Sequence, residues 1–236
     1  MINMLFGNLT PQLLIMRLLA VVLALTVHEF CHGYAAYKLG DRTAQGMGRL
    51  SLNPMHHIDP IGMVLIILVG FGWAKPVMVN PFNLNNPKRD MAIISIAGPL
   101  SNFIMAFVGM MIAYPLIRLG GGEGAIPIRN MLQFTGQLPP VGVWGHVFAF
   151  MGVFVIINIV LGVFNLIPIP PLDGSKILAL FLPNHLYFRF TNFRHGMIIM
   201  LVLIFSGTTN LIINPALRGI FNLFRNIAGG LYGLIL

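Results

Sequence analysis

The sequence predicts an all-α polytopic membrane protein, a helical bundle of about four to six membrane segments with a small membrane-embedded region of strand and loop. Composition is the first reason: 57% of the 236 residues are hydrophobic and 8% are charged, whereas soluble domains carry about 25% charged residues. The second reason is that several apolar runs are long enough to cross a bilayer, which takes about 20 residues. Short loops rich in glycine, proline and basic residues separate these runs.

The first apolar run extends from about Pro11 to Tyr37, and Arg17 is its only charge outside one polar cluster. We expect a helix that continues to about Lys38 and spans about 40 Å, enough to cross the hydrocarbon layer. The Gly-Asp pair at 40–41 should end it. Residues 1–10 are expected to be a short uncharged segment. The run is too long for a signal peptide and lacks a basic start, so we do not expect its removal.

The polar cluster in this run is His28-Glu29-Phe30-Cys31-His32, an H-E-x-x-H pattern. Residues four apart share one face of a helix, so His28 and His32 can present two imidazole nitrogens to one metal ion. Glu29 is offset by one residue and is therefore free to act on a bound water. A carboxylate in hydrocarbon costs roughly 2.5–3.5 kcal/mol, so the cluster predicts a functional site. The site should lie within the membrane, about 15 Å from the end of the helix.

The segment from Arg42 to Pro60 is polar and interrupted by glycine and proline, which predicts an ordered loop. The apolar run from Ile61 to Phe71 is too short to span the membrane as a helix, so we expect it to be re-entrant or partly inserted. Prolines and β-branched residues from Trp73 to Pro81 suit an edge strand or a loop packed against the protein.

A second long helix is predicted from about Asp90 to Leu119. Its small residues at 97–99, followed by Ser101-Asn102, permit close helix contact and a local kink. A Gly/Pro-rich loop from Gly120 to Pro140 leads to a third helix at about Val141 to Phe164, which the prolines that follow must end.

A shorter helix is expected at about Ser175 to Leu182, followed by a basic loop with Arg189 and Arg194. The next helix is expected at about Gly196 to Phe205, and its extension to Ile213 stays open. The apolar tail, residues 215–236, either lies on the membrane interface or spans the membrane.

The formal net charge is +8, and such an excess of basic residues can indicate nucleic-acid binding. Here the basic residues are scattered over short loops and form no stripe, so we expect a lipid bilayer and no nucleic acid as partner. If the long helices alternate in direction, one side of the membrane carries Lys38, Arg42, Arg49, Lys75, Lys88, Arg89, Lys176, Arg189 and Arg194. The positive-inside rule then makes this side cytoplasmic, puts the N-terminus outside and places the site nearer the cytoplasm.

A catalytic zinc ion needs three protein ligands and an open position for water, so two histidines leave one ligand to find. Asp173 is the best candidate in apolar surroundings. It follows a proline break at the end of a membrane helix, where irregular backbone can line a cavity, and it lies on the same side of the membrane as His32. Pro-Leu-Asp-Gly before a helix is also a capping pattern, so a role as N-cap stays open, and both roles can hold.

The motifs together resemble those of the site-2 protease family of intramembrane zinc metalloproteases, peptidase family M50, from residue 28 to about 178. The matching motifs are His28-Glu29-Phe30-Cys31-His32, Gly40-Asp41, Asn53-Pro54 with His57-Ile58-Asp59-Pro60, Trp73-Ala74-Lys75-Pro76-Val77, Ala97-Gly98-Pro99-Leu100-Ser101-Asn102, Asn165-Leu166-Ile167-Pro168 and Leu172-Asp173-Gly174. H-E-x-x-H alone is unspecific, but the combination is highly specific.

The resemblance implies that His28, His32 and Asp173 ligate one zinc ion per chain. It implies that Glu29 is the general acid and base of peptide hydrolysis. It also implies that Asn165 helps to hold the substrate or to polarise the scissile carbonyl.

The resemblance further implies that Trp73–Val79 belong to a membrane-embedded strand region that can pair with an unwound substrate. The implied substrate is a membrane protein with a transmembrane helix, cut in or near that helix by regulated intramembrane proteolysis in a bacterial or archaeal plasma membrane. We expect one domain, with a catalytic core at about 11–183 and C-terminal helices at about 195–236. No PDZ insertion or CBS domain is expected, so the regulation that these domains provide in relatives is not carried over.

Two other functional classes use the same residues: a membrane metal-ion or proton transporter with a buried His/Glu/Asp path, and an inactive scaffold that binds membrane helices. The helical phase of the two histidines favours one fixed site over a path, and the intact Glu29 gives inactivity no support. Asn165 as a cap of its own helix stays open. Asn102 is interpreted as a bond between helices, and His56 and His57 as interfacial loop histidines.

Overall fold

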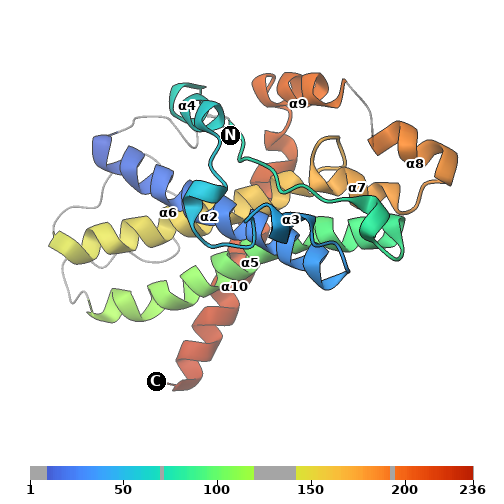
Figure 1. The fold of residues 1–236 in the computed structure, drawn as a ribbon. Helices are drawn as coiled ribbons and strands as arrows, with labels where there is room; N and C mark the ends of the chain where they lie inside the picture. Colours follow the sequence, from blue (N-terminus) through green and yellow to red (C-terminus); the bar gives the residue numbers. More distant parts are fainter. Residues whose placement is uncertain (1–9, 70–71, 120–141, 192–194, 236) are drawn as a thin grey trace.

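The computed structural model describes residues 10–69, 72–119, 142–191 and 195–235. In these parts all the regular elements are helices, and no strand is assigned (Figure 1). The predicted all-α class is therefore confirmed. Residues 1–9 of the expected first segment, the expected loop at 120–140 and Arg194 lie outside the described residues.

Helix α2, Pro11–Lys38, has both of its ends defined by local sequence. The side-chain oxygen of Thr10 accepts a hydrogen bond from the Leu13 amide at 3.3 Å, and a proline occupies the first helical position. At the other end Gly40 adopts a φ of +106°, a left-handed conformation that stops the helix. The predicted span is therefore confirmed.

Three helices are long and apolar enough to cross a membrane: α2, α5 (Pro87–Leu119) and α6 (Gly142–Asn165). They run side by side in Figure 1. Helices α9 (Gly196–Phe205) and α10 (Asn210–Ile235) are bent by 74° at a short break, and they add a fourth span if the pair crosses as one. The described residues thus give three or four spans; four is the low end of the predicted range, and three is below it.

The core lies where α5, α6 and α10 meet. Seven of its residues are completely buried: Ala106, Met110, Ala113, Val155, Ile159, Phe221 and Ala228. Two small residues of α2, Ala20 and Ala24, are also completely buried and allow this helix to pack closely against α6. This packing fixes the face of α2 that carries the two histidines.

Between α2 and α5 the chain forms four short helical elements. They are α3 (Thr43–Gly46), η1 (Pro54–His56), α4 (Pro60–Val69) and η2 (Pro81–Asn83). Two of them lie in the segment predicted as an ordered loop. The predicted short apolar insertion is α4, whose ten residues are too few to span a membrane.

The predicted edge strand is reduced, within the described residues, to one isolated bridge between Ala74 and Ile58. The Lys75 amide reinforces it by donating to the His57 carbonyl at 2.8 Å. The next amide on this side of the segment, that of Val77, donates to the Glu29 side chain instead, so the ladder does not continue. The remaining residues before η2 have no assigned helix or strand.

A buried carboxylate ties this segment to the end of α2. Asp41 is completely buried, and it accepts hydrogen bonds from the Asn80 amide at 2.7 Å, the Asn83 side chain at 2.7 Å and the Thr43 amide at 3.1 Å. Burial raises the pKa of Asp41, but the hydrogen bonds that favour its ionised form outweigh burial and hold the pKa below its ordinary value. The segment is therefore anchored on the helix that carries the H-E-x-x-H motif.

Two predictions for the C-terminal part are wrong. The expected basic loop contains helix α8, Asn184–Thr191, which begins because the Pro183 carbonyl accepts from the amides of Leu186 and Tyr187. Helix α10 begins five residues before Pro215, where the predicted tail starts, and the Thr209 carbonyl accepts from the amides of Ile212 and Ile213 in its first turn.

Candidate metal centre

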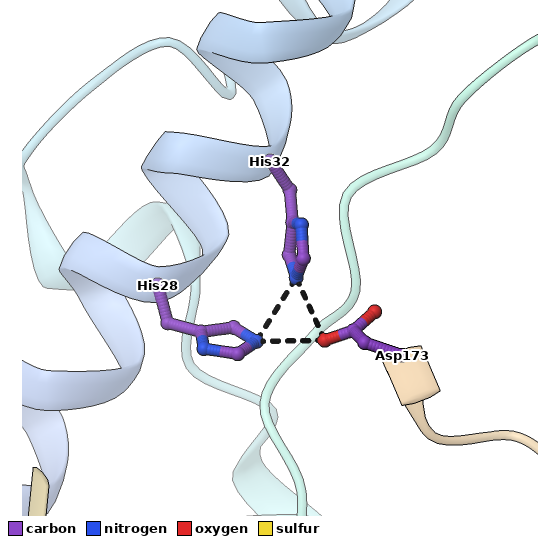
Figure 2. A group of neighbouring side chains, drawn as sticks. All are labelled: His28, His32 and Asp173. Atoms are coloured by element: carbon purple, nitrogen blue, oxygen red, sulfur yellow. Dashed lines mark hydrogen bonds and ion pairs between the residues drawn. The ribbon is translucent and has the colours of Figure 1, made fainter. Parts of the chain in front are cut away.

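His28 and His32 point from adjacent turns of α2 toward one point, as Figure 2 shows. Their Nε2 atoms are 2.9 Å apart. The carboxylate oxygen Oδ2 of Asp173 lies 3.1 Å from Nε2 of His32 and 3.3 Å from Nε2 of His28. All three side chains are buried. Three donor atoms from two distant parts of the chain thus converge on one small volume.

Asp173 reaches this point as the first residue of α7, Asp173–Ala179, after the chain breaks at the end of α6. The following residue must be glycine, because a Cβ on Gly174 would lie 2.6 Å from the Ile167 carbonyl oxygen and overlap the Leu166 carbonyl. The N-cap of α7 is Leu172, and no side chain caps it. The alternative interpretation of Asp173 as an N-cap is therefore wrong.

The second ring nitrogen of each histidine is held by an acceptor. Nδ1 of His32 donates to the Ile94 carbonyl at 2.7 Å, since a carbonyl can only accept. Nδ1 of His28 lies 2.7 Å from the side-chain oxygen of Asn102. A proton on each Nδ1 leaves the Nε2 lone pairs, which face Asp173, available to a metal ion.

Gly98 on α5 makes room for the site. A Cβ at this position would lie 2.6 Å from Cε1 of both His28 and His32, so any side chain would fill the space beside the rings. A tetrahedral zinc ion with bonds of about 2.0–2.1 Å holds its ligand atoms about 3.3 Å apart, close to the observed separations of 2.9–3.3 Å. The donor set of two imidazoles and one carboxylate fits zinc.

Glu29 lies beside this donor set and is half-buried. Its Oε2 accepts a hydrogen bond from the Val77 amide at 2.9 Å, which fixes the carboxylate against the extended segment that Asp41 anchors. Oε1 has no partner in the part of the chain that the structure describes. One oxygen of Glu29 is thus positioned by the backbone, while the other makes no hydrogen bond to the described part of the chain.

Comparison with known proteins decides the family. The family model described as peptidase family M50 matches residues 16–206 of this chain. The chain belongs to peptidase family M50. The predicted resemblance to the site-2 protease family is therefore confirmed. Because the family consists of membrane metalloproteases and the described residues include three apolar helices of spanning length, this M50 chain is an integral membrane metalloprotease.

Its relatives carry matching names. A protein of Bacillus subtilis named "Putative zinc metalloprotease YwhC" is 35% identical over 212 residues, which cover 89% of this chain and 88% of the relative. "Putative zinc metalloprotease Rip2" of Mycolicibacterium smegmatis is 26% identical over 66% of this chain and 53% of its own length. "Putative zinc metalloprotease MJ0611" of Methanocaldococcus jannaschii is 26% identical over 73% of this chain and 74% of its own length. No solved structure matches.

The structure places Asn165 at the end of α6, half-buried, where its side-chain amide donates to the Leu161 carbonyl at 3.0 Å. This contact is a bond within the helix and joins Asn165 to none of the three metal-ligating candidates. Its role toward a substrate stays a prediction. His57 is buried and holds the loop through a 2.7 Å contact with the Ser51 carbonyl, and the His56 carbonyl accepts from Arg49.

Sequence reasoning missed Asn158. This residue of α6 is completely buried, and its Oδ1 accepts a hydrogen bond from the side-chain amide of Asn102 at 3.0 Å. Asn102 therefore bonds between helices, as predicted, but it also bonds the ring of a candidate ligand. The signal in the sequence was an amide side chain inside an otherwise apolar span, two helical turns before Asn165.

Proposed function

We propose that this M50 metalloprotease is a zinc-dependent intramembrane endopeptidase that cuts peptide bonds in or near the transmembrane helices of membrane proteins. The observation that carries the proposal is the buried group of His28, His32 and Asp173, with Glu29 beside it, on a helix long and apolar enough to span the membrane. This arrangement supplies three ligands and a carboxylate that is not a ligand, which is the composition of a catalytic zinc site.

In this proposal His28, His32 and Asp173 hold the zinc ion. A zinc ion held by these residues would act as a Lewis acid and lower the pKa of the attacking water to about 7. Oε1 of Glu29 takes a proton from the attacking water, while the Val77 amide keeps Oε2 in place. Glu29 then delivers that proton to the nitrogen of the leaving amine. Asn165, at the end of α6, is proposed to hold the substrate or to polarise its carbonyl.

A transmembrane helix hides its carbonyls in its own hydrogen bonds, so a substrate must unwind before it can be cut. The freed backbone needs new partners in lipid, and an extended segment can provide them. Residues 74–79 are such a segment, and Lys75, Pro76 and Met78 have exposed side chains. Because Val77 in this segment bonds Glu29, a substrate paired there would lie next to the catalytic carboxylate.

We further propose that the enzyme acts in a bacterial or archaeal plasma membrane with its site nearer the cytoplasm, and that regulated proteolysis of membrane proteins is its task. Basic residues concentrated after α2 and before α5 support this orientation, since cytoplasmic loops carry an excess of lysine and arginine.

The test is cleavage of single-pass membrane proteins by the purified chain in detergent, scored by mass spectrometry of the fragments, with and without a zinc chelator. Glu29→Gln should retain zinc, because its amide oxygen can still accept from the Val77 amide. Its turnover should fall by roughly 10²-fold or more through loss of the base. The proposal would be overturned if Glu29→Gln still cleaved the substrates, or if the wild type still cleaved them in the presence of the chelator.

A further inference from the structure

Asn158 bonds none of the proposed zinc ligands directly, but it ends a chain of hydrogen bonds that leads to one of them. Its side-chain nitrogen donates to the Phe154 carbonyl at 2.9 Å in the same helix. A main-chain carbonyl has lone pairs but no proton, so the NH₂ side of the amide must face it. The oxygen of Asn158 must therefore face the opposite direction, toward Asn102.

The next amide is oriented by the first. The nitrogen of Asn102 faces the oxygen of Asn158 at 3.0 Å and the Ala24 carbonyl at 3.5 Å, and both of these groups only accept. The oxygen of Asn102 therefore faces His28, 2.7 Å from Nδ1. A side-chain oxygen there accepts a hydrogen bond, so Nδ1 is the protonated nitrogen and Nε2 keeps its lone pair.

The reverse orientation would disable this ligand. If the amide of Asn102 were flipped, its NH₂ would face Nδ1 of His28 and favour the tautomer with the proton on Nε2, the atom that faces Asp173. The flip would also place the oxygen of Asn102 against the oxygen of Asn158 with no proton between them. His32 needs no such chain of side chains, because the Ile94 carbonyl sets its tautomer directly.

We infer that Asn158 is a positioning residue for zinc: through Asn102 it fixes the tautomer of His28 that binds the metal. Both asparagines are completely buried between the long helices, and water is not at hand to replace a lost partner. The inference rests on the proposed zinc site, and it concerns metal affinity and not turnover. Its test therefore gives a result whether or not a cleaved substrate is found.

The experiment measures the zinc dissociation constant of purified protein by competition with a chelator. Asn158→Leu removes both hydrogen bonds of the side chain, and Asn158→Ser keeps a hydroxyl for the Phe154 carbonyl but is too short to reach Asn102. Both variants should weaken zinc binding about 10-fold. Losing the hydrogen-bond partner of a metal ligand usually weakens metal binding about 10- to 100-fold. The low end applies here because the Ala24 carbonyl still faces Asn102.

Thr26→Val is the matched control. Thr26 is buried in α2, and its hydroxyl donates to the Val22 carbonyl at 2.7 Å, so this variant also loses one bond to the carbonyl four residues earlier. Thr26 has no part in the chain of hydrogen bonds from Asn158 to His28, so the zinc affinity of Thr26→Val should stay within about twofold of the wild type. Thermal unfolding of the metal-free proteins shows whether each variant is folded, and Asn158→Ser serves if Asn158→Leu is not.

A double-mutant cycle separates positioning from a general loss of packing. Asn102→Leu alone should weaken zinc binding about 10- to 100-fold. If Asn158 acts through Asn102, adding Asn158→Leu to this variant should change the affinity by no more than about twofold. Losses that multiply in the double variant would overturn the inference, as would a folded Asn158 variant that binds zinc like the wild type.

Discussion

The Val77 amide donates a hydrogen bond to Oε2 of Glu29 at 2.9 Å. This contact joins the helix that carries the proposed base to the extended segment proposed to receive the substrate. Asp41, which accepts from the Asn80 amide, joins the same two elements three residues further along. The carboxylate of Glu29 is therefore oriented by the segment against which a substrate backbone would pair.

Val77→Pro should impair catalysis without removing zinc. Proline has no N–H, so Oε2 of Glu29 loses the partner that orients it, and turnover should fall about 10- to 100-fold, part of the contribution of a positioned base. The measurement is turnover of a model substrate together with the zinc content of each protein. Val77→Ala is the control, since it shortens the side chain but keeps the amide. Equal turnover in the two variants would show that this hydrogen bond does not matter.

Gly98→Ala should abolish zinc binding. The added Cβ would lie 2.6 Å from Cε1 of both His28 and His32, so the rings or α5 must move out of position. The measurement is zinc content after purification in trace-metal-free buffer. Gly219→Ala is the matched control, because a Cβ at that position of α10 meets no atom within 4 Å. This control should keep its zinc and gain about 0.5–1 kcal/mol of stability from better helix propensity. Full zinc content in Gly98→Ala would show that the two helices lie further apart.

Asp41→Asn should destabilise the fold at neutral pH by about 1–3 kcal/mol, because an amide cannot accept every hydrogen bond that the carboxylate accepts. The folded pKa of Asp41 lies below its unfolded value, so its contribution is complete above the unfolded pKa and is lost as pH falls through the folded pKa. The difference in unfolding midpoint between wild type and variant should thus shrink in acid below about pH 4. A difference that stays constant down to pH 2 would contradict this role.

Local chemistry explains which parts of the fold were predictable. Helix α2 begins at a Thr-Pro cap and ends at a glycine with positive φ, and both signals lie in the sequence. Asp173 lies 141 positions from His32, so helical spacing cannot pair them; its place after a proline break in apolar surroundings and the family resemblance both indicated it as the third ligand.

The missed features depend on tertiary contacts. Helix α8 consists mostly of weak helix formers such as Asn, His, Tyr, Phe and Thr, so composition favoured a loop. Asn158 bonds Asn102 because of the way α6 is rotated about its own axis against α5. The sequence does not reveal this rotation, because α6 is hydrophobic on every face. For residues 73–81 the sequence left an edge strand and a packed loop open, and the structure has a single bridge, because pairing depends on a partner strand that composition does not show.

The zinc content of Asp173→Ala tests the proposed centre most directly, because Asp173 is the ligand that must come from a distant part of the chain. Metal analysis of the purified wild type should find one tightly bound zinc ion per chain. The variant, left with two imidazoles, should lose it on dialysis while its metal-free fold is retained. An Asp173→Ala protein that keeps one tightly bound zinc ion per chain would contradict the site.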